Sequence, residues 1–323
     1  MSDFRNRPVL VLGGLGFIGG RLADRLLTTG AKVTIVTPSR DRHVETAALF
    51  EARGARILEA DMRDGAAMSA AVAQQDVIFN LAGQSGAVRS MEDPWTDLDV
   101  NCRGNLSLLE AVRVVNREAK IVFAGSRLEY GHPPHLPVTE DAAQEPLCVH
   151  AIHKITVEHY LRLYARLFGI RYTIARLTNP YGPGQPRERT TYGVVNRMIH
   201  LALGGETLSV YGDGSQRRDY IYIDDAVEAL LALARSPRSD GRAYNVGTGV
   251  GTRLMDMALL IVRCAGGGRI DSVTWPPLAQ QIETGDFIAD IAKIHDHLGW
   301  QPAVLLEEGL QRTVAFYRVH VGS

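Results

Sequence analysis

Residues 9–20 read Val9-Leu10-Val11-Leu12-Gly13-Gly14-Leu15-Gly16-Phe17-Ile18-Gly19-Gly20. The four apolar residues at the start predict a buried strand, and the apolar periodicity that follows predicts a helix. The glycines between them, spaced Gly13-x-x-Gly16-x-x-Gly19, suit a strand that turns directly into a helix. Gly13 permits the tight turn, Gly16 lets backbone approach a diphosphate, and Gly19 allows the helix to pack closely on the strand.

The start of this helix is a candidate site for the diphosphate of a dinucleotide. Backbone N–H groups are unpaired at a helix N-terminus and the helix dipole is positive there, so an anion is favoured. The glycine pattern is informative because a strand precedes it and a helix follows it. The candidate binding residues of this turn are Gly13, Gly16, Phe17, Ile18 and Gly19. The alternative is a tight strand–helix turn that holds no ligand.

Short β-branched runs alternate with amphipathic stretches through the first half of the chain. Strands are expected at 9–12, 33–37, 56–60, 77–81, 121–124 and 172–177. Helices are expected at 20–29, 105–115 and 151–168. This alternation predicts an α/β fold, a Rossmann-like doubly wound parallel sheet with a smaller C-terminal α/β substrate lobe.

A Pro- and Gly-rich stretch at 179–189 predicts a loop and a boundary between two regions. We expect residues 1–178 to form the NAD(P)-binding domain and 179–323 to form mainly the substrate lobe, with 219–247 returning to the first domain. Helices are expected at 193–203 and 225–235, a strand at 244–246, and a tight turn at Gly212-Asp213-Gly214-Ser215. A ligand cleft is then expected at the carboxyl ends of the strands.

The composition is that of an ordinary globular protein and excludes several classes. Hydrophobic residues make up 46% of the 323 residues, and 35 basic against 36 acidic residues give a net charge of −1. No strong field attracts nucleic acid or anionic membrane, and no apolar run reaches the ~18 residues of a membrane span. The three cysteines (Cys102, Cys148 and Cys264) form no CxxC pair, which favours a reducing compartment. The charged start at residues 1–7 does not read as a signal peptide. We expect a cytoplasmic protein.

The end of the second strand reads Ile35-Val36-Thr37-Pro38-Ser39-Arg40. A carboxylate at this place would accept a hydrogen bond from the adenosine ribose of NAD, whereas an arginine suits the 2′-phosphate of NADP. The strand ends without a carboxylate, so Thr37, Ser39 and Arg40 favour NADP over NAD. The alternative is that Arg40 and Arg42 are solvated loop charges.

Further motifs follow along the chain. They are Asp61-Met62-Arg63-Asp64, Asn80-Leu81-Ala82-Gly83, Asp93-Pro94-Trp95 with Asn101-x-x-Gly104, Arg176-Leu177-Thr178-Asn179-Pro180-Tyr181-Gly182-Pro183-Gly184, Tyr211-Gly212-Asp213-Gly214-x-x-Arg217-Arg218-Asp219-Tyr220 and Leu298-Gly299-Trp300-x-Pro302. With them the chain resembles, from Val9 to Tyr317, the extended short-chain dehydrogenase/reductase family, in particular its nucleotide-sugar epimerases and dehydratases.

The resemblance implies further binding residues. Those near the dinucleotide would be Asp61, Met62, Leu81, Ala82 and Gly83, with Asp61 at the adenine. Those near a nucleotide-diphosphate sugar would be Ser126, Arg127, His150, Asn179, Tyr211 and Arg218.

Arg218 also has a physical case of its own, because a guanidinium can make paired contacts to a phosphate. The alternative for Arg218 is an ion pair with Asp219 or Asp224. The acidic stretch Glu283-Thr284-Gly285-Asp286 stands where relatives often carry a nucleotide-binding arginine, which leaves the preferred base open.

The catalytic motif of the family departs from its usual form in this chain. By resemblance, a Ser or Thr acts with a Tyr-x-x-x-Lys pair; Ser126 and Lys154 align, but His150 stands at the tyrosine position. An imidazole has a pKa of about 6.5 and suits a neutral base near pH 7, and Lys154 would disfavour its charged form. His150 is therefore a candidate acid/base, or else a substrate-orienting or inert residue. His153, one helical turn on, is expected to be structural.

Two other chemistries are disfavoured. The pairs His150-x-x-His153 and His132-x-x-His135 lack a third ligand, so no metal is expected. In the family, 4,6-dehydratases carry an Asp-Glu pair directly after the Ser or Thr, and decarboxylases use the same Glu. Here Arg127 and Leu128 occupy those places, and Glu129 is one residue late, which on a strand points to the opposite face.

The resemblance thus favours an NAD(P)-dependent nucleotide-sugar epimerase, an isomerase that oxidises its substrate transiently, at C4. The alternatives are an NADPH-dependent keto-sugar reductase and a non-catalytic NAD(P)- or sugar-nucleotide-binding protein. The apolar faces of 105–115 and 155–168 resemble helices through which relatives form homodimers, although both also suit packing on their own sheet. The sequence leaves the sugar, the base and the pathway open.

Overall fold

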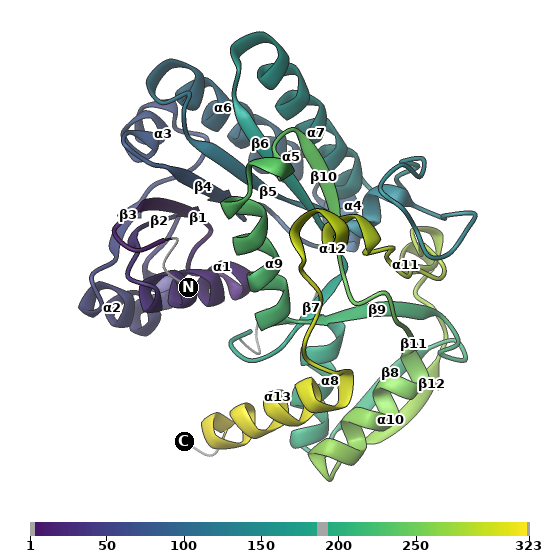
Figure 1. Cartoon of the computed structure of the whole chain (residues 1–323). Helices are drawn as coiled ribbons and strands as arrows, with labels where there is room; N and C mark the ends of the chain where they lie inside the picture. The colour runs from purple at the N-terminus through teal and green to yellow at the C-terminus, as the bar shows by residue number, and fades with distance from the viewer. Residues whose placement is uncertain (1–3, 186–192, 322–323) are drawn as a thin grey trace.

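The computed structural model describes residues 4–185 and 193–321, and within them a seven-stranded parallel sheet forms the centre of the first region (Figure 1). In sheet order, the strands are β10 (Arg242–Val246), β6 (Arg171–Leu177), β5 (Lys120–Ser126), β4 (Val77–Asn80), β1 (Pro8–Leu12), β2 (Lys32–Thr37) and β3 (Arg56–Glu59). The chain runs outward from β1 to β3 and then resumes at β4 on the other side of β1. This order confirms the predicted Rossmann-like sheet, whose ligands bind beyond the carboxyl ends at such a reversal.

Helices cover both faces of the sheet, because alternate residues of a strand point to opposite sides. Val9 and Val11 pack in one core with α1 and α9, whereas Leu10 and Leu12 pack in another with α3, α6 and α7. The helices of this region are α1 (Phe17–Thr28), α2 (Val44–Ala52), α3 (Gly65–Val72), α4 (Ala87–Glu92), α5 (Pro94–Leu98), α6 (Gly104–Val115), α7 (Val149–Phe168), α9 (Ile223–Arg235) and α12 (Ala292–Leu298).

A second, smaller group of elements forms the lower part of Figure 1 around its own apolar core. Its strands are β7 (Asn179–Tyr181), β8 (Thr207–Tyr211), β9 (Arg217–Tyr222), β11 (Gly251–Arg253) and β12 (Arg269–Val273), and its helices are α8 (Val194–Leu203), α10 (Leu254–Ala265) and α13 (Leu306–Val321). Helix α11 (Pro277–Gln281) instead packs Leu278 against Cys148 and Ala151 at the start of α7. β9 lies between β7 and β11, and β12 pairs with β8.

The loop predicted at 179–189 is wrong at its start. Asn179–Tyr181 forms strand β7, because its backbone pairs in parallel with β9, 41 residues later along the chain. Residues 186–189 lie outside the described part of the chain. The predicted glycine turn after β8 is confirmed, since Gly212 and Gly214 have φ angles of 65° and 69°.

Three short elements bring side chains to the start of α7. Helices α4 and α5 precede a π-helical turn, η2 (Asp99–Arg103), and all three contact α7. After β5 the chain forms a short 3₁₀ helix, η3 (Arg127–Tyr130); η1 (Asp41–His43) and η5 (Pro237–Ser239) are of the same kind. π-helical turns inside helices frequently occur at functional sites.

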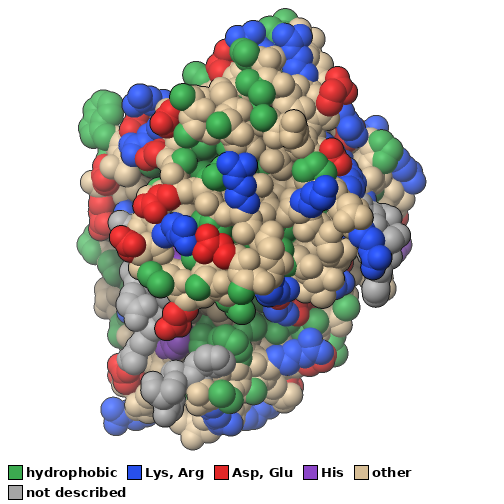
Figure 2. Space-filling view, turned by 90° about the vertical axis from the view of Figure 1, so that its left-hand side faces the viewer, with side chains coloured by type: hydrophobic (Ala, Val, Ile, Leu, Met, Phe, Trp, Pro, Cys, Tyr) green, Lys and Arg blue, Asp and Glu red, His purple; other side chains and the backbone are tan. Residues whose placement is uncertain are grey.

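The surface agrees with the near-zero net charge. On the face shown in Figure 2, acidic and basic side chains are interspersed rather than gathered into a patch of one sign. Among the described residues, none of the helices combines the length and the apolar character that crossing a bilayer would require.

Candidate active site

The glycine turn between β1 and α1 leaves no room for side chains. A Cβ atom on Gly19 would lie 2.2 Å from the carbonyl oxygen of Gly13, and Gly13 itself has a φ of +75°. Gly16 precedes α1 without a side-chain cap, and the first turn of α1 carries no acidic residue. The backbone N–H groups there can therefore receive an anion, and the turn fits the diphosphate of a dinucleotide.

The same turn adjoins another segment that was predicted to lie near the dinucleotide. A Cβ atom on Gly13 would lie 3.0 Å from the backbone of Leu81 and Ala82, which follow β4. Gly83, the next residue, has a φ of +159° and approaches the side chain of Asn101. The structure thus brings two of the predicted dinucleotide segments together at the carboxyl ends of β1 and β4.

The end of β2 carries no carboxylate. The hydroxyl of Thr37 lies 3.1 Å from the carbonyl oxygen of Ser39, and Arg40 forms an ion pair with Glu51 of α2 at 2.7 Å. Arg40 is 41% exposed, so this pair is open to water. The side chain of Arg42 lies outside the described part of the structure. Glu51 offsets part of the charge that a 2′-phosphate would meet.

Asp61 and Met62 follow β3, where an adenine was expected. Arg63 donates to both carboxylate oxygens of Asp61, at 2.9 Å and 2.6 Å, and also forms an ion pair with Asp99. Hydrogen bonds from Arg63 lower the pKa of Asp61. Met62 is buried beside Gly104 of α6. The Asp61 carboxylate is therefore fixed as an ionised acceptor.

Ser126 ends β5 and Lys154 lies in the second turn of α7. The Ser126 hydroxyl accepts a hydrogen bond from the backbone of Leu128 at 3.2 Å, which leaves its own proton free to donate. The Lys154 ammonium donates to the carbonyl oxygen of Ala124, two residues before Ser126, at 2.8 Å. Burial lowers the pKa of Lys154 to about 8. The structure thus brings Lys154 to the strand end that carries Ser126.

His150 lies in the first turn of α7, and its side chain is 8% exposed. Its Nδ1 atom faces α5 and η2, 3.6 Å from the carboxylate of Asp97 and 3.5 Å from the amide nitrogen of Asn101. Burial lowers the pKa of His150 and Lys154 acts in the same direction, while Asp97 opposes them. The imidazole is therefore neutral near pH 7.

Asp97 was not predicted as a site residue, although its carboxylate is 0% exposed. His153, predicted to be structural, approaches the other oxygen of this carboxylate, with its Nδ1 atom 2.6 Å away. Burial opposes the charged form of Asp97, but hydrogen bonds from His150, His153 and Asn101 outweigh it and lower its pKa. One buried carboxylate thus serves two histidines of α7.

Arg127 and Asn179, both expected near the nucleotide sugar, contact each other. The Arg127 guanidinium donates to Asn179 at 3.1 Å and to the hydroxyl of Thr284 at 2.9 Å. Burial and the neighbouring Arg218 lower the pKa of Arg127 to about 9. Within residues 4–185 and 193–321, Arg127 forms no ion pair with a carboxylate. Its charge is available to an anionic group of a ligand.

Arg218 is nearly buried and does not pair with either acid that the sequence suggested. It donates to Glu283 and to the carbonyl oxygen of Gly285, both in the acidic stretch. Asp219 instead accepts from the backbone of Thr248 at 2.8 Å, and Asp224 pairs with Arg21. The alternative for Arg218, an ion pair with Asp219 or Asp224, is therefore wrong, and its role at a phosphate stays a prediction. The reason is that residues 283–286 fold back against β9, where Asp286 also pairs with Arg217.

Tyr211 ends β8 beside an aromatic partner. Its ring centroid lies 5.0 Å from that of Trp275, and Gly212 lies close to the same indole. Tyr211 is partly exposed. No contact in the described residues links Tyr211 to Arg127 or to Asn179.

Glu129 is fully buried. It lies in η3 rather than on a strand, so the expected reason, strand alternation, does not apply. Its carboxylate accepts from the backbone of Ser126 at 2.6 Å and lies 3.4 Å from the buried Arg176. Burial and the nearby Glu158 raise the pKa of Glu129. It belongs to a buried network beneath the strand ends.

The histidine pairs give no metal geometry. In the part of the chain that the structure describes, no group of three or more His, Cys, Asp or Glu side chains is arranged to hold a metal ion. The cluster around Asp97 is instead held by hydrogen bonds.

Sequence reasoning missed Asp97 and Thr284. Asp97 stands four residues before Asn101, so both lie on one face of the helical segment, and this spacing to a motif residue was an available signal. Thr284 lies in the stretch 283–286, whose place in relatives was a signal for the segment, but its contact with Arg127, 157 residues away, has no sequence signal.

Comparisons with known proteins agree with this geometry. The profile of the NAD dependent epimerase/dehydratase family matches residues 9–247. The UDP-glucose 4-epimerase of Mycolicibacterium smegmatis is 34% identical over 315 residues, which cover 96% of this chain and 98% of that protein. The structure of the Thermotoga maritima UDP-glucose 4-epimerase with UDP-glucose has a TM-score of 0.87 at 31% identity, covering 97% of this chain and 99% of that one.

Another structure and two further relatives show which other reactions similar proteins are named for. The Thermus thermophilus UDP-glucose 4-epimerase in complex with NAD has a TM-score of 0.85 at 29% identity, covering 96% of this chain and 99% of that one. A dTDP-glucose 4,6-dehydratase of Xanthomonas campestris is 29% identical over 95% of this chain and 92% of its own length. A UDP-N-acetyl-alpha-D-glucosaminuronate decarboxylase of Bacillus cytotoxicus is 31% identical over 96% of this chain and 97% of its own length. The family therefore includes several reactions.

On the profile match and these identities, the chain belongs to the NAD-dependent epimerase/dehydratase family of extended short-chain dehydrogenases/reductases.

Proposed function

We propose that this protein is a nucleotide-sugar epimerase that inverts C4 of the sugar by transient oxidation with a bound NAD(P). The observation that carries the proposal is the arrangement at the carboxyl ends of β1, β4 and β5. A glycine turn suited to a diphosphate, a free serine hydroxyl and a neutral histidine beside a lysine are gathered there. The UDP-glucose 4-epimerase relatives support the same reading.

The dinucleotide, when bound, would take a hydride from the sugar carbon and give it back. The side chains of this chain would do the rest. Ser126 donates its free proton to the reacting sugar oxygen, and His150 takes the hydroxyl proton and later returns it. Lys154, held by the carbonyl of Ala124, orients the ribose next to the nicotinamide and keeps a positive charge nearby.

Other residues of the proposed site hold the two ligands. Gly13, Gly16, Phe17, Ile18 and Gly19 bind the dinucleotide diphosphate, with Thr37, Ser39, Arg40, Asp61, Met62, Leu81, Ala82 and Gly83 around the rest of it. Arg127, Asn179, Tyr211 and Arg218 bind the nucleotide-diphosphate sugar. Because Glu283 already engages Arg218, the guanidinium of Arg127 is the less neutralised of the two.

Epimerisation fits the site better than dehydration or decarboxylation. Both of those reactions would need a carboxylate next to Ser126, but Arg127 and Leu128 follow it. The nearest acid in sequence, Glu129, is buried with Arg176 and Glu158. What remains in the cleft is one proton shuttle, which is sufficient for hydride exchange at a hydroxyl-bearing carbon.

A second candidate is an NADPH-dependent keto-sugar reductase. The observation that favours it is the end of β2, where Thr37, Ser39 and Arg40 offer no carboxylate to the ribose of NAD. Oxidation of NADPH by a 4-keto-sugar, without interconversion of epimers, would support this candidate. Binding of dinucleotide and sugar nucleotide with no turnover would instead support a non-catalytic role.

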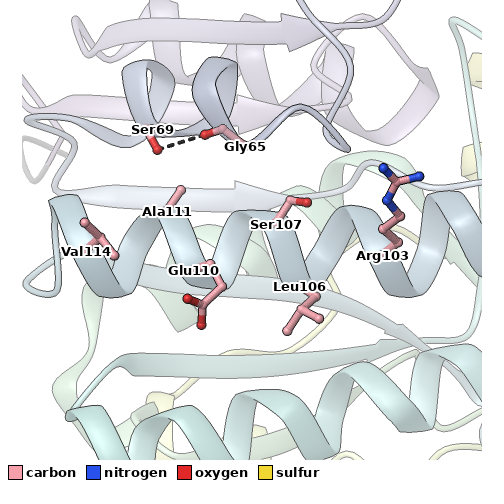
Figure 3. Close-up of a pocket in the computed structure, with 8 residues that line it drawn as sticks. All are labelled: Gly65, Ser69, Arg103, Leu106, Ser107, Glu110, Ala111 and Val114. Atoms are coloured by element: carbon pink, nitrogen blue, oxygen red, sulfur yellow. Dashed lines mark hydrogen bonds between the residues drawn. The ribbon is translucent and has the colours of Figure 1, made fainter.

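We further propose that the protein forms a homodimer through α6 and α7. Both helices expose apolar side chains, among them Val114 at 68% and Leu167 at 58%. Residues of α3 and α6 line a hollow of about 410 Å³, and Figure 3 shows Leu106 and Glu110 pointing from α6 away from α3. This surface lies on the helical layer rather than at the strand ends. Sedimentation of the purified protein tests it directly.

The test of the epimerase proposal is incubation with a panel of nucleotide sugars, with NAD or NADP, followed by proton NMR of the anomeric signals. We expect one pair of C4 epimers to interconvert. Replacing His150 with Phe should reduce turnover by about 10²–10⁴-fold, the usual contribution of a positioned acid/base, with dinucleotide binding unchanged. His159→Phe, on the exposed face of the same helix, is the matched control. Unchanged turnover in His150→Phe would refute the role of His150.

A further inference from the structure

The orientation of the Asn101 side chain is fixed by its neighbours. Its carbonyl oxygen accepts from the backbone N–H of Gln84 at 3.0 Å, and its amide nitrogen donates to the carbonyl oxygen of Gln84 at 3.0 Å. Exchanging the amide oxygen and nitrogen would set donor against donor and acceptor against acceptor. The amide nitrogen of Asn101 is therefore the atom that faces Asp97 and His150.

The number of hydrogens on the Asn101 amide shows that it cannot donate to His150. The amide nitrogen has two hydrogens. One is used by Gln84 and the other by Asp97, whose carboxylate oxygen lies 2.9 Å away. None is left for the Nδ1 atom of His150 at 3.5 Å. If Nδ1 were unprotonated, its lone pair would be buried next to a carboxylate and an amide that has no hydrogen to give.

Protonation on Nδ1 removes this conflict. The N–H then points to the Asp97 oxygen that lies 3.6 Å away, and this oxygen has no other hydrogen-bond partner among the described residues. His153 supplies the donor for the other Asp97 oxygen at 2.6 Å. With Nδ1 of His150 facing Asp97, the Nε2 atom lies at the opposite edge of the ring. No residue in the described ranges hydrogen-bonds Nε2.

We propose that Asp97 is a positioning residue that holds His150 in the tautomer protonated on Nδ1, so that the lone pair of Nε2 receives the proton of the sugar hydroxyl. His153 and Asn101 hold Asp97 in place. The inference rests on the proposed function. In the forward half of the reaction the sugar O–H bond breaks and an H–Nε2 bond forms, and in the return half the same proton goes back. The imidazolium that exists in between is balanced by the Asp97 carboxylate.

Protonation on Nδ1 explains how a histidine can occupy the position of the family's catalytic tyrosine. A phenol has one oxygen and one proton, whereas an imidazole has two nitrogens and needs a partner to fix which one is basic. Asp97 supplies that partner from α5, and the backbone N–H of His150 is fixed separately by the Ser90 hydroxyl at 3.0 Å. The charged and titratable groups that face His150 are Asp97 from α5 and His153 and Lys154 from α7.

The first test uses the unmodified protein. Labelling the imidazole nitrogens with ¹⁵N and recording their shifts with dinucleotide present distinguishes the two tautomers, and a His150→Phe sample assigns the His150 signals. We expect the proton on Nδ1 and an unprotonated Nε2. A proton on Nε2 would overturn the proposal. This measurement does not depend on turnover, so its failure is distinct from failure of the epimerase proposal.

The second test is Asp97→Asn, with Glu92→Gln on the neighbouring exposed turn as the matched control. We expect kcat to fall by about 10²–10⁴-fold with the dinucleotide Kd retained. Because the carboxylate favours the imidazolium, its loss should also move the acid limb of the kcat/KM profile to lower pH. An unchanged kcat, or an acid limb that stays in place, would overturn the proposal. If the variant does not fold, the tautomer measurement decides.

A double variant separates positioning from structural support. In a His150→Tyr background the phenol has only one oxygen, so no partner is needed to select a tautomer. Asp97→Asn should therefore reduce kcat there by less than tenfold. A structural role for Asp97 would give the same large loss in both backgrounds, and that result would contradict the proposal. If His150→Phe alone leaves turnover unchanged, the proposed function fails before Asp97 is considered.

Discussion

The glycine turn after β1 and the polar cluster around Asp97 lie at the same edge of the sheet but are built in opposite ways. The turn offers only backbone, and a single added Cβ at Gly19 would meet the Gly13 carbonyl oxygen at 2.2 Å. The cluster offers only side chains, drawn from α5, η2 and α7. The first is therefore sensitive to volume and insensitive to pH, and the second is sensitive to charge and protonation.

The largest expected effect in this comparison comes from Gly19→Ala. The new methyl group cannot be accommodated without moving the Gly13 carbonyl, which accepts the N–H of Gly16 at 2.9 Å. We expect a loss of about 1–3 kcal/mol in the free energy of unfolding, as in other overpacked sites, and a more than tenfold weaker dinucleotide Kd. Thermal unfolding and calorimetric titration measure both.

Gly20→Ala is the matched control for that variant. A Cβ atom at Gly20 would lie 3.8 Å from the nearest backbone atom, an ordinary contact. Because alanine is about 1 kcal/mol more favourable than glycine inside a helix, stability should be unchanged or slightly higher. Equal losses in the two variants would show that steric fit at Gly19 is not what the turn requires.

The pH profile of kcat/KM tests the second half of the comparison, the protonation of the polar cluster. The reaction needs neutral His150, whose pKa is lowered from 6.5, so activity should rise with pH through an acid limb below 6.5. It should fall again as Lys154, with a pKa of about 8, loses its proton. An acid limb above 6.5 would contradict a neutral, buried base. Gly20→Ala should show the same two limbs.

The smallest expected effect is at the edge of the dinucleotide site. Arg40→Asp should weaken NADP binding more than NAD binding, by about tenfold or less, because the guanidinium is exposed and already paired with Glu51. Titrations with both dinucleotides measure the ratio. Arg117→Asp, an exposed arginine at the end of α6, controls for net charge. Equal losses for NAD and NADP would remove Arg40 as a reader of the 2′-phosphate.

The contrast also explains what could be predicted from the sequence. The turn spans residues 13–19, so its requirements are local and appear as a glycine spacing. The strands of this sheet, such as β1, send alternate apolar side chains into two cores, and these β-branched apolar runs made the parallel sheet predictable. The strand at Asn179–Tyr181 was missed because its partner, β9, lies 41 residues away and no local sequence pattern indicates the pairing.

The same reasoning applies to the site. Ser126, His150 and Lys154 were predictable because a family motif fixes their spacing. Asp97 was not, since its role depends on how α5 packs against α7, a long-range contact. For Arg218, the alternative to a phosphate contact was an acid near it in sequence, but its acidic partner is Glu283, 65 residues on. Side-chain partners that come from distant segments are fixed by packing rather than by spacing.

One measurement tests the central claim most directly. The purified protein is incubated with NAD or NADP and with each nucleotide sugar of the panel deuterated at C4, and the product is followed by proton NMR. Inversion by transient oxidation at a single closed site predicts that the other epimer forms with the deuterium still at C4, and that His150→Phe stops its formation. Dinucleotide binding without interconversion of any sugar in the panel, or inversion with loss of the label to water, would contradict the account.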